Sequence, residues 1–142
     1  MNPKTVVIFG VFDGVHDGHK ALIREAKLEG ERLVAIVARD SEVKFLKGKS
    51  PIHDEVKRIN NLLDVPDIDS VFLGDLEQGT YKMLKEVNPD IIFLGYDQKQ
   101  LFESINNAIK EGILPSIEIK FGNPHNPETF KSSILNKNES TN

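Results

Sequence analysis

Two patterns of apolar residues alternate along the chain. Segments that are apolar at nearly every position are typical of strands buried on both faces, and residues 5–9, 33–38, 70–73 and 91–94 have this pattern. A fifth segment, 116–121, alternates apolar and polar residues and predicts an edge strand with one wetter face. We therefore expect five strands.

Helical spacing occupies the stretches between these strands. Apolar residues that recur at every third or fourth position predict helices with one buried face. They are Ala21, Leu22 and Ala26; Ile52, Val56, Ile59 and Leu63; Leu84 and Val87; and Leu101, Ile105, Ala108 and Ile109. Strands that alternate with helices predict an α/β fold with an open, mainly parallel sheet and helices on both faces. Ligands of such sheets bind beyond the carboxyl ends of the strands, where the strand order reverses.

Length and composition predict one globular domain. The chain has 142 residues, of which 39% are hydrophobic and 28% charged, and domains usually contain about 100–200 residues. We expect the domain to span residues 1–135 and a polar tail to span residues 136–142. No apolar run approaches the roughly 18 residues that cross a bilayer, and the N-terminus lacks the features of a signal peptide.

Net charge and cysteine content exclude several classes of function. The net charge of −4 argues against a dedicated nucleic-acid binder, which usually has a basic domain. The chain contains no cysteine, which excludes disulfides, thiolate metal sites and a cysteine nucleophile. A chain without cysteine also fits a reducing compartment, so we expect a cytoplasmic protein without a membrane partner.

The strongest chemical signal follows the first strand, in the segment Gly10-Val11-Phe12-Asp13-Gly14-Val15-His16-Asp17-Gly18-His19. Its glycines allow a sharp turn and a close approach of the backbone to a ligand. Asp17 is expected to cap the following helix, which would place Gly18 and His19 in the first turn. A helix N-terminus attracts anions, and His16 and His19 could both face it. The pattern favours stabilisation of charge on a phosphate.

Other interpretations of the two histidines stay open at this point. A loop histidine is commonly a solvated side chain, and a pair could hold a metal ion. No third ligand is obvious, because the neighbouring Asp13 and Asp17 have other expected uses, and we assign no metal ligand. The segment is neither the dinucleotide fingerprint nor a P-loop, which would need Gly-Lys-Ser or Gly-Lys-Thr.

Basic residues follow the second strand. Residues 39–49 contain four basic and two acidic side chains, a net charge of +2 within an acidic chain. Lys44 and Lys47, three positions apart, could share a helix face and contact a polyphosphate. The alternative is a solvated surface, but a position at the carboxyl end of a strand favours the phosphate role.

Two later segments could complete a site. Asp97, in Gly95-Tyr96-Asp97-Gln98 after the fourth strand, could bind a nucleotide donor group or cap the next helix. Near the end of the chain, Ser132 and Ser133 precede an apolar pair, as expected for an N-cap. A second helix terminus could therefore point at the same anion pocket.

The first loop resembles the G-x-F-D…H-x-G-H signature of the cytidylyltransferase-like nucleotidyltransferase superfamily. The resemblance covers residues 6–135, including a D-x-x-V…L-K-G element after the second strand, and implies a Rossmann-like three-layer sandwich with a five-stranded sheet. Residues 89–98 resemble the corresponding element of archaeal-type FAD synthases. Two departures are visible. Val11 stands where many members have threonine, and the basic residue expected after Ser132-Ser133-Ile134 is missing.

The resemblance implies a nucleotidyltransferase, in which an acceptor phosphate attacks the α-phosphorus of a nucleoside triphosphate and pyrophosphate leaves. Positioning and charge stabilisation carry the rate of such transfers. The implied catalytic residues are His16 and His19 at the α-phosphate and Lys44 at the β,γ-phosphates. The implied nucleotide-binding residues are Gly10, Val11, Phe12, Asp13, His16, Gly18, His19, Lys47, Arg58, Gly95, Asp97, Ser132 and Ser133. Mg²⁺ would accompany the triphosphate, and no tightly bound organic cofactor is expected.

The resemblance favours ATP and FMN as substrates, giving FAD. This preference rests on residues 95–98 and on the segment 12–16, which also resembles bacterial FAD synthetases. The alternatives are cytidylyl transfer from CTP to glycerol 3-phosphate and adenylyl transfer to a sugar phosphate such as a heptose phosphate. A nucleotide-binding module without catalysis is a further alternative, which Val11 and the thinned C-terminal motif favour. Relatives commonly form homodimers, and we expect one here.

Overall fold

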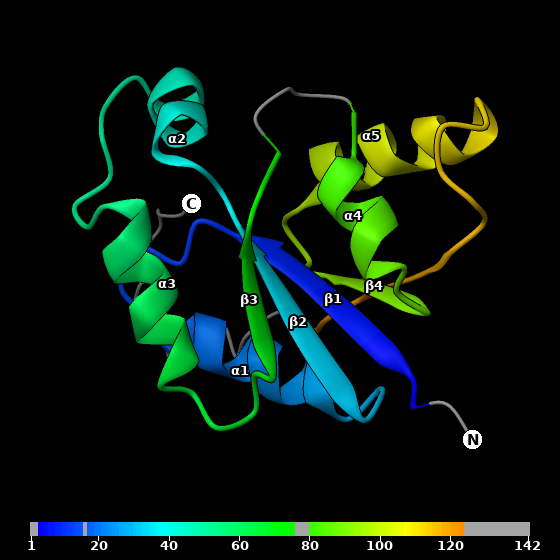
Figure 1. Cartoon of the computed structure of the whole chain (residues 1–142), viewed down its shortest axis with the longest axis horizontal. Coiled ribbons are helices and arrows are strands. Elements are labelled where there is room, and N and C mark those ends of the chain that lie inside the picture. Colours follow the sequence, from blue (N-terminus) through cyan, green and yellow to red (C-terminus); the bar gives the residue numbers. More distant parts are fainter. Residues whose placement is uncertain (1–2, 16, 76–79, 124–142) are drawn as a thin grey trace.

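A parallel sheet of five strands forms the centre of the molecule (Figure 1). The computed structural model describes residues 3–15, 17–75 and 80–123. Its strands are β1 Thr5–Gly10, β2 Arg32–Val37, β3 Ser70–Leu73, β4 Ile91–Leu94 and β5 Glu118–Phe121. Their order is β3-β2-β1-β4-β5, and each neighbouring pair is parallel. The predicted five-stranded sheet is confirmed, and β5 lies at an edge as expected.

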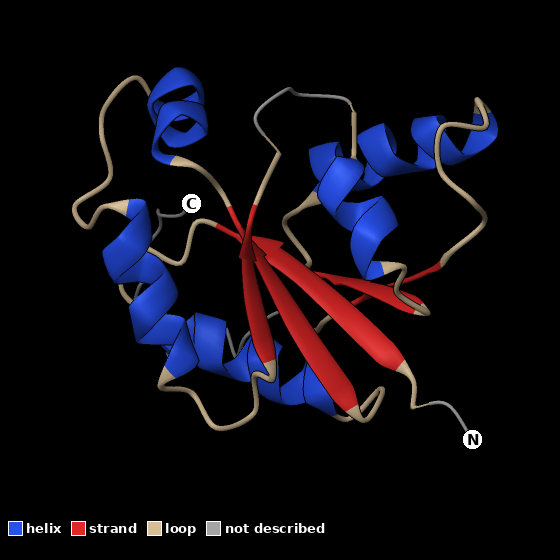
Figure 2. Ribbon diagram, viewed as in Figure 1, coloured by secondary structure: helices blue, strands red, loops and turns tan. Residues whose placement is uncertain are grey.

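Helices cover both faces of the sheet and make three layers (Figure 2). The helices are α1 Asp17–Lys27, α2 Asp40–Lys47, α3 Glu55–Leu63, α4 Lys82–Val87 and α5 Lys99–Lys110. Residues of α1 and α3 share one core cluster with the sheet, and residues of α4 and α5 share the other. The three-layer α/β prediction is therefore confirmed.

The central strand shows why the sheet is buried on both sides. Val6 and Ile8 of β1 pack into the cluster beneath α1 and α3, whereas Val7 packs into the cluster beneath α4 and α5. All three side chains have no exposed surface. Successive residues of a strand point to opposite faces, so a strand covered on both faces must be apolar throughout.

The helix α3 is confirmed, but three of the four residues of its predicted apolar face are exposed, and Ile59 alone of the four packs against the core cluster. Ile52 precedes the helix, and Ile52, Val56 and Leu63 are 87%, 64% and 54% exposed. The helix instead buries Arg58 and Leu62. The spacing of apolar residues could not reveal which face of α3 is buried, because the hydrogen bonds that hold Arg58 in the interior come from other segments.

The sheet order reverses between β1 and β4. From β1 the chain moves to β2 and β3 on one side and then returns to β4 and β5 on the other. The loops after β1 and β4 therefore meet at the carboxyl edge of the sheet, where ligands of such folds bind. None of the helices in the described part of the chain has the length and apolar character that crossing a membrane requires. The expected tail, 136–142, lies outside the described residues.

Candidate functional site

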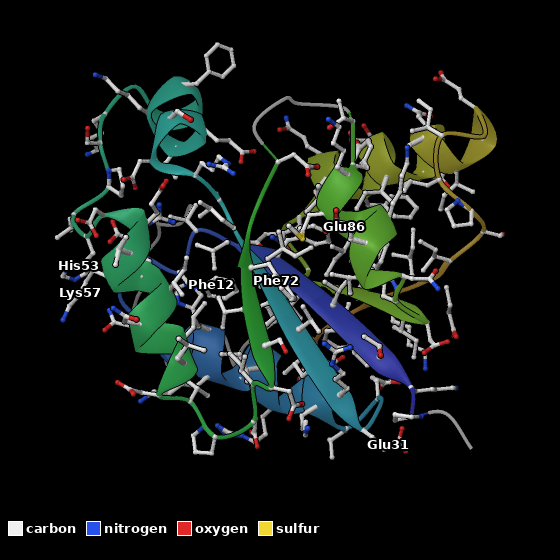
Figure 3. All side chains as sticks on the ribbon, in the orientation of Figure 1. Phe12, Glu31, His53, Lys57, Phe72 and Glu86 are labelled. Carbon is white, nitrogen blue, oxygen red and sulfur yellow. The ribbon has the colours of Figure 1, made fainter. Side chains whose placement is uncertain are left out.

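The loop after β1 makes a tight turn around the ring of Phe12. Phe12 has a φ of 54° and is only 1% exposed, and it lies between the sheet and α3 in Figure 3. A Cβ atom on Gly10 would lie 2.8 Å from Cε2 of that ring. Residue 10 must therefore be glycine for the aromatic ring to fold back under the loop, which is a physical reason for the G-x-F pattern.

His19 lies in the first turn of α1 and contacts this loop at two points. Its Nδ1 is 3.2 Å from the carbonyl oxygen of Gly14, and because a carbonyl only accepts, Nδ1 must be the donor. The His19 ring meets the Phe12 ring edge-on, with 5.1 Å between the ring centroids. The imidazole is thus held at the start of a helix, where anions are stabilised.

The start of α1 differs by one residue from the expectation. The helix begins at Asp17 itself, so the predicted capping role of Asp17 is wrong in register, and Gly18 and His19 are in the first turn as predicted. His16 lies outside the described residues. The predicted meeting of two imidazoles therefore stays a prediction for His16.

Asp13 fixes the same loop to the segment that leads into α3. Its carboxylate accepts hydrogen bonds from the amides of Ile52 at 2.7 Å and His53 at 2.9 Å. Burial raises the pKa of Asp13, but these hydrogen bonds and the nearby charges of His53 and Arg58 outweigh it and hold the pKa below its usual 3.8. The charged form of Asp13 is therefore the one that the fold stabilises.

Arg58 is completely buried and donates to three oxygens of the protein. Its Nη1 donates to the Val11 carbonyl at 2.8 Å, and its Nε donates to the His53 carbonyl at 3.1 Å. Its Nη2 lies 2.7 Å from Oδ1 of Asp40, with which it forms an ion pair. Arg58 is therefore not one of the solvated charges of the α3 surface. Its contact with a nucleotide stays a prediction.

Asp40 also joins the starts of two helices. Its amide donates to Oε1 of Glu55 at 2.8 Å, and its own Oδ2 accepts from the Glu55 amide at 3.2 Å. Asp40 begins α2 and Glu55 begins α3. The first amide groups of a helix have no acceptor within their own helix. Here each carboxylate accepts from the other residue's amide, so one such amide at each helix start gains a partner.

The predicted lysines lie on α2, which follows β2 at the carboxyl edge. Lys44 and Lys47 are both within this helix, as their spacing predicts, and Lys44 is exposed. The side chain of Lys47 lies outside what the structure describes. Just before the helix, Arg39 donates from Nε to the Gly74 carbonyl at 2.7 Å, which ties the start of α2 to the end of β3.

Gln98 connects the ends of β1 and β4. Its Oε1 accepts from the Gly95 amide at 2.8 Å, and its Nε2 donates to the Phe9 carbonyl at 3.1 Å. Gln98 is also the N-cap residue of α5, so the alternative in which Asp97 occupies that position is wrong. Asp97 is exposed at the same carboxyl edge.

The described residues thus bring the loop after β1 together with α3, Asp40 and Gln98. Ser132 and Ser133 lie outside the described residues, so a second helix terminus stays a prediction. In the same described portion, no group of three or more histidine, aspartate or glutamate side chains could hold a metal ion.

Sequence reasoning missed Asp40 and Gln98. Asp40 was noted only as a charge in a basic stretch and as the aspartate of the D-x-x-V element, and Gln98 only as the last residue of the segment 95–98; neither was assigned a role. A polar residue in the short loop between β4 and α5, at the edge where ligands bind, was the available signal for Gln98. For Asp40, the only signal was a carboxylate in the first turn of a helix.

Comparison with known proteins gives a consistent result. The model of the family described as cytidylyltransferase-like matches residues 7–129. A FAD synthase of Aciduliprofundum boonei is 43% identical over 94 residues, which are 66% of this chain and 62% of that protein. The chain thus spans slightly less than two thirds of that relative. A FAD synthase of Thermococcus sibiricus is 33% identical over 129 residues, which are 91% of this chain and 84% of that protein.

Solved structures agree with the sequence comparison. A lipopolysaccharide core biosynthesis protein from Thermoplasma volcanium superimposes with a TM-score of 0.75 at 37% identity, over 88% of this chain and 100% of that one. The matched residues 7–129 include the glycine loop, 10–14, the helix start with His19 and the reversal of strand order. The chain belongs to the cytidylyltransferase-like family.

Proposed function

We propose that this protein transfers the adenylyl group of ATP to FMN, giving FAD and pyrophosphate. The observation that carries the proposal is the position of His19, held by Gly14 and Phe12 in the first turn of α1 beside the glycine loop. The similarity to archaeal FAD synthases supports the choice of ATP and FMN.

In the proposed reaction, a phosphate oxygen of FMN attacks the α-phosphorus of ATP. The bond from that phosphorus to the bridging oxygen of the β-phosphate breaks, and pyrophosphate leaves with the electron pair. His19, together with His16, would donate hydrogen bonds to the α-phosphate, where negative charge grows in the transition state. The N-terminus of α1 would stabilise the same charge, since its amides point toward a bound anion.

The remaining residues of the proposed site bind and orient ATP. Lys44 and Lys47 on α2 would hold the β- and γ-phosphates as point charges. The glycine loop, 10–14, lets the backbone approach the phosphates. Gly95 and Asp97 would contact the nucleoside, and Ser132 and Ser133 the phosphates. Holding the two reactants in line supplies most of the acceleration in such transfers.

A divalent ion, which we propose to be Mg²⁺, would enter with ATP as part of the substrate. The described residues offer no cluster of ligands for a resident ion, and Mg²⁺ is commonly held by phosphates and water with few protein ligands. The residues that the structure describes do not fit a dedicated metal site, and no step above depends on one. We propose no bound organic cofactor.

Adenylyl transfer to a sugar phosphate is the second candidate. It is favoured by the structural likeness to the Thermoplasma volcanium protein, which is described as acting in lipopolysaccharide core biosynthesis. Both candidates use the same proposed phosphate site and differ only in the acceptor.

Pyrophosphate release with a panel of substrates tests the proposed function. Release with ATP and FMN supports FAD synthesis, and release only with ATP and a heptose phosphate supports the second candidate. Release only with CTP and glycerol 3-phosphate would contradict both. Binding of ATP without release in any combination would identify a nucleotide-binding module instead.

We further propose a cytoplasmic homodimer, which binds neither nucleic acid nor membrane. The absence of cysteine supports the location, and exposed apolar side chains such as Phe45, at 83%, and Ile52, at 87%, support self-association. Sedimentation equilibrium measures the mass of the assembly. A monomer at micromolar concentration would contradict the dimer.

A further inference from the structure

Arg58 is the charged side chain that has no exposed surface among the described residues. Burying a guanidinium is costly unless its charge is balanced and its N–H groups are hydrogen-bonded. Asp40 balances the charge, and at least three of the five N–H groups donate to protein oxygens, since the carbonyls of Val11 and His53 accept beside Oδ1 of Asp40. Each nitrogen of the guanidinium therefore already has a protein partner.

We propose that Arg58 is a positioning residue for nucleotidyl transfer and not a ligand of the triphosphate. This inference rests on the proposed function. The Val11 carbonyl that accepts from Nη1 lies between Gly10 and Phe12, at the centre of the turn. Fixing this carbonyl fixes the turn that carries the Phe12 ring and leads to the Gly14 carbonyl. These two groups hold His19.

Asp13 holds the same loop from the same side. Its carboxylate accepts from the amides of Ile52 and His53, and the His53 carbonyl accepts from Arg58. The loop after β1 is thus attached to the segment 52–58 through a carboxylate and through a guanidinium. Two attachments at Val11 and Asp13 restrict the rotation of the backbone between them.

Substitution of Asp40 distinguishes a positioning role of Arg58 from a direct contact of Arg58 with the triphosphate. Its Oδ1 pairs with Arg58, and its Oδ2 accepts from the Glu55 amide. A carboxylate repels a triphosphate, so any loss of activity on neutralising Asp40 cannot come from a lost phosphate contact. Neutralising Asp40 would instead free the Arg58 guanidinium from its ion pair. If Arg58 were a ligand of the triphosphate, this variant would bind ATP more tightly.

The test compares Asp40→Asn and Arg58→Lys with the control Lys57→Ala. Lys57 is exposed on the outer side of α3 (Figure 3) and has no assigned role. We expect kcat to fall about tenfold or more in both test variants, since small displacements of a reacting group cost this much. The dissociation constant of ATP should change by less than about threefold, because the lost interaction acts in the transition state. Lys57→Ala should retain wild-type values.

Hydrogen exchange of the backbone amides of residues 10–14 gives a readout that needs no substrate. We expect faster exchange at these amides in Asp40→Asn than in the wild type or Lys57→Ala. Wild-type kcat in Asp40→Asn, or exchange at the wild-type rate, would overturn the positioning role. Tighter ATP binding by Asp40→Asn, with wild-type turnover in Arg58→Lys, would establish a ligand role instead.

A measurement on the wild-type protein covers the case in which the variants fail to fold. The Nε proton of Arg58 should exchange slowly with water in the free protein, and exchange at the rate of an exposed arginine would overturn the proposal. If the wild type transfers no nucleotide to any acceptor, the proposed function fails. The exchange of residues 10–14 then decides whether Arg58 fixes the loop.

Discussion

The side chain of Gln98 donates from Nε2 to the Phe9 carbonyl at 3.1 Å, between residues 89 positions apart in the chain. The same side chain accepts from the Gly95 amide. This single amide group therefore ties the end of β4 to the end of β1, at the point where the strand order reverses. A side chain that both donates and accepts is required there, and glutamine is the residue that reaches both groups.

Gln98→Glu should destabilise the protein by about 1–3 kcal/mol, because the Phe9 carbonyl loses its donor and faces a carboxylate. Chemical unfolding monitored by circular dichroism measures this loss. Gln100→Glu, an exposed position of the same helix, is the control and should leave stability unchanged. Equal stability of the two variants would mean that the bridge contributes nothing.

His19→Ala should lower turnover on the order of a hundredfold or more, since removing one charge-stabilising donor typically costs about 2.7–4 kcal/mol of barrier. Loss of the contact with Phe12 should reduce stability by only about 0.5–1.5 kcal/mol. Steady-state kinetics and thermal unfolding separate the two effects. Lys20→Ala, at the neighbouring exposed position, should behave as wild type. Wild-type turnover of His19→Ala would remove the imidazole from the mechanism.

Lys44→Ala should weaken ATP binding about fivefold, as expected for an exposed charge worth about 1 kcal/mol. Because a charge–charge contact is screened by salt, the dependence of binding on ionic strength should also become weaker. Calorimetric titrations at several salt concentrations measure both quantities. Lys110→Ala, an exposed lysine on α5, serves as the matched control. Equal ATP affinity in the two variants would assign Lys44 to the solvated surface.

Asp13→Asn should remove a part of the stability that depends on pH. The pKa of Asp13 is lowered in the folded protein, so its contribution is fully present above the unfolded value of 3.8 and is lost as the pH falls through the folded value. The wild type should therefore be more stable than Asp13→Asn at pH 6, and the difference should shrink below about pH 3.8.

Urea unfolding at pH 6 and at pH 3 measures this difference. Glu103→Gln, at an exposed position of α5, controls for the loss of one negative charge. A difference between wild type and Asp13→Asn that stays constant over this range would show that the hydrogen bonds to Ile52 and His53 do not depend on the charge of Asp13.

The sheet could be predicted from the sequence because burial on both faces makes each strand apolar over a short, continuous segment. The position of His19 in a first helical turn could be predicted because its determinants lie within the same loop. The burial of Arg58 could not, since its partners Val11 and Asp40 are 47 and 18 positions away. Contacts between distant segments leave no periodic signal, and the exposed face of α3 was misassigned for this reason.

The fate of the α-phosphorus of ATP tests the central claim most directly. The protein is incubated with Mg²⁺, FMN and ATP that carries an isotopic label at either the α- or the γ-phosphorus, and the products are separated. Adenylyl transfer at the proposed site predicts that the α-label appears in FAD and the γ-label in pyrophosphate. Transfer of the γ-label to the acceptor, or recovery of unlabelled FMN with intact ATP, would contradict it.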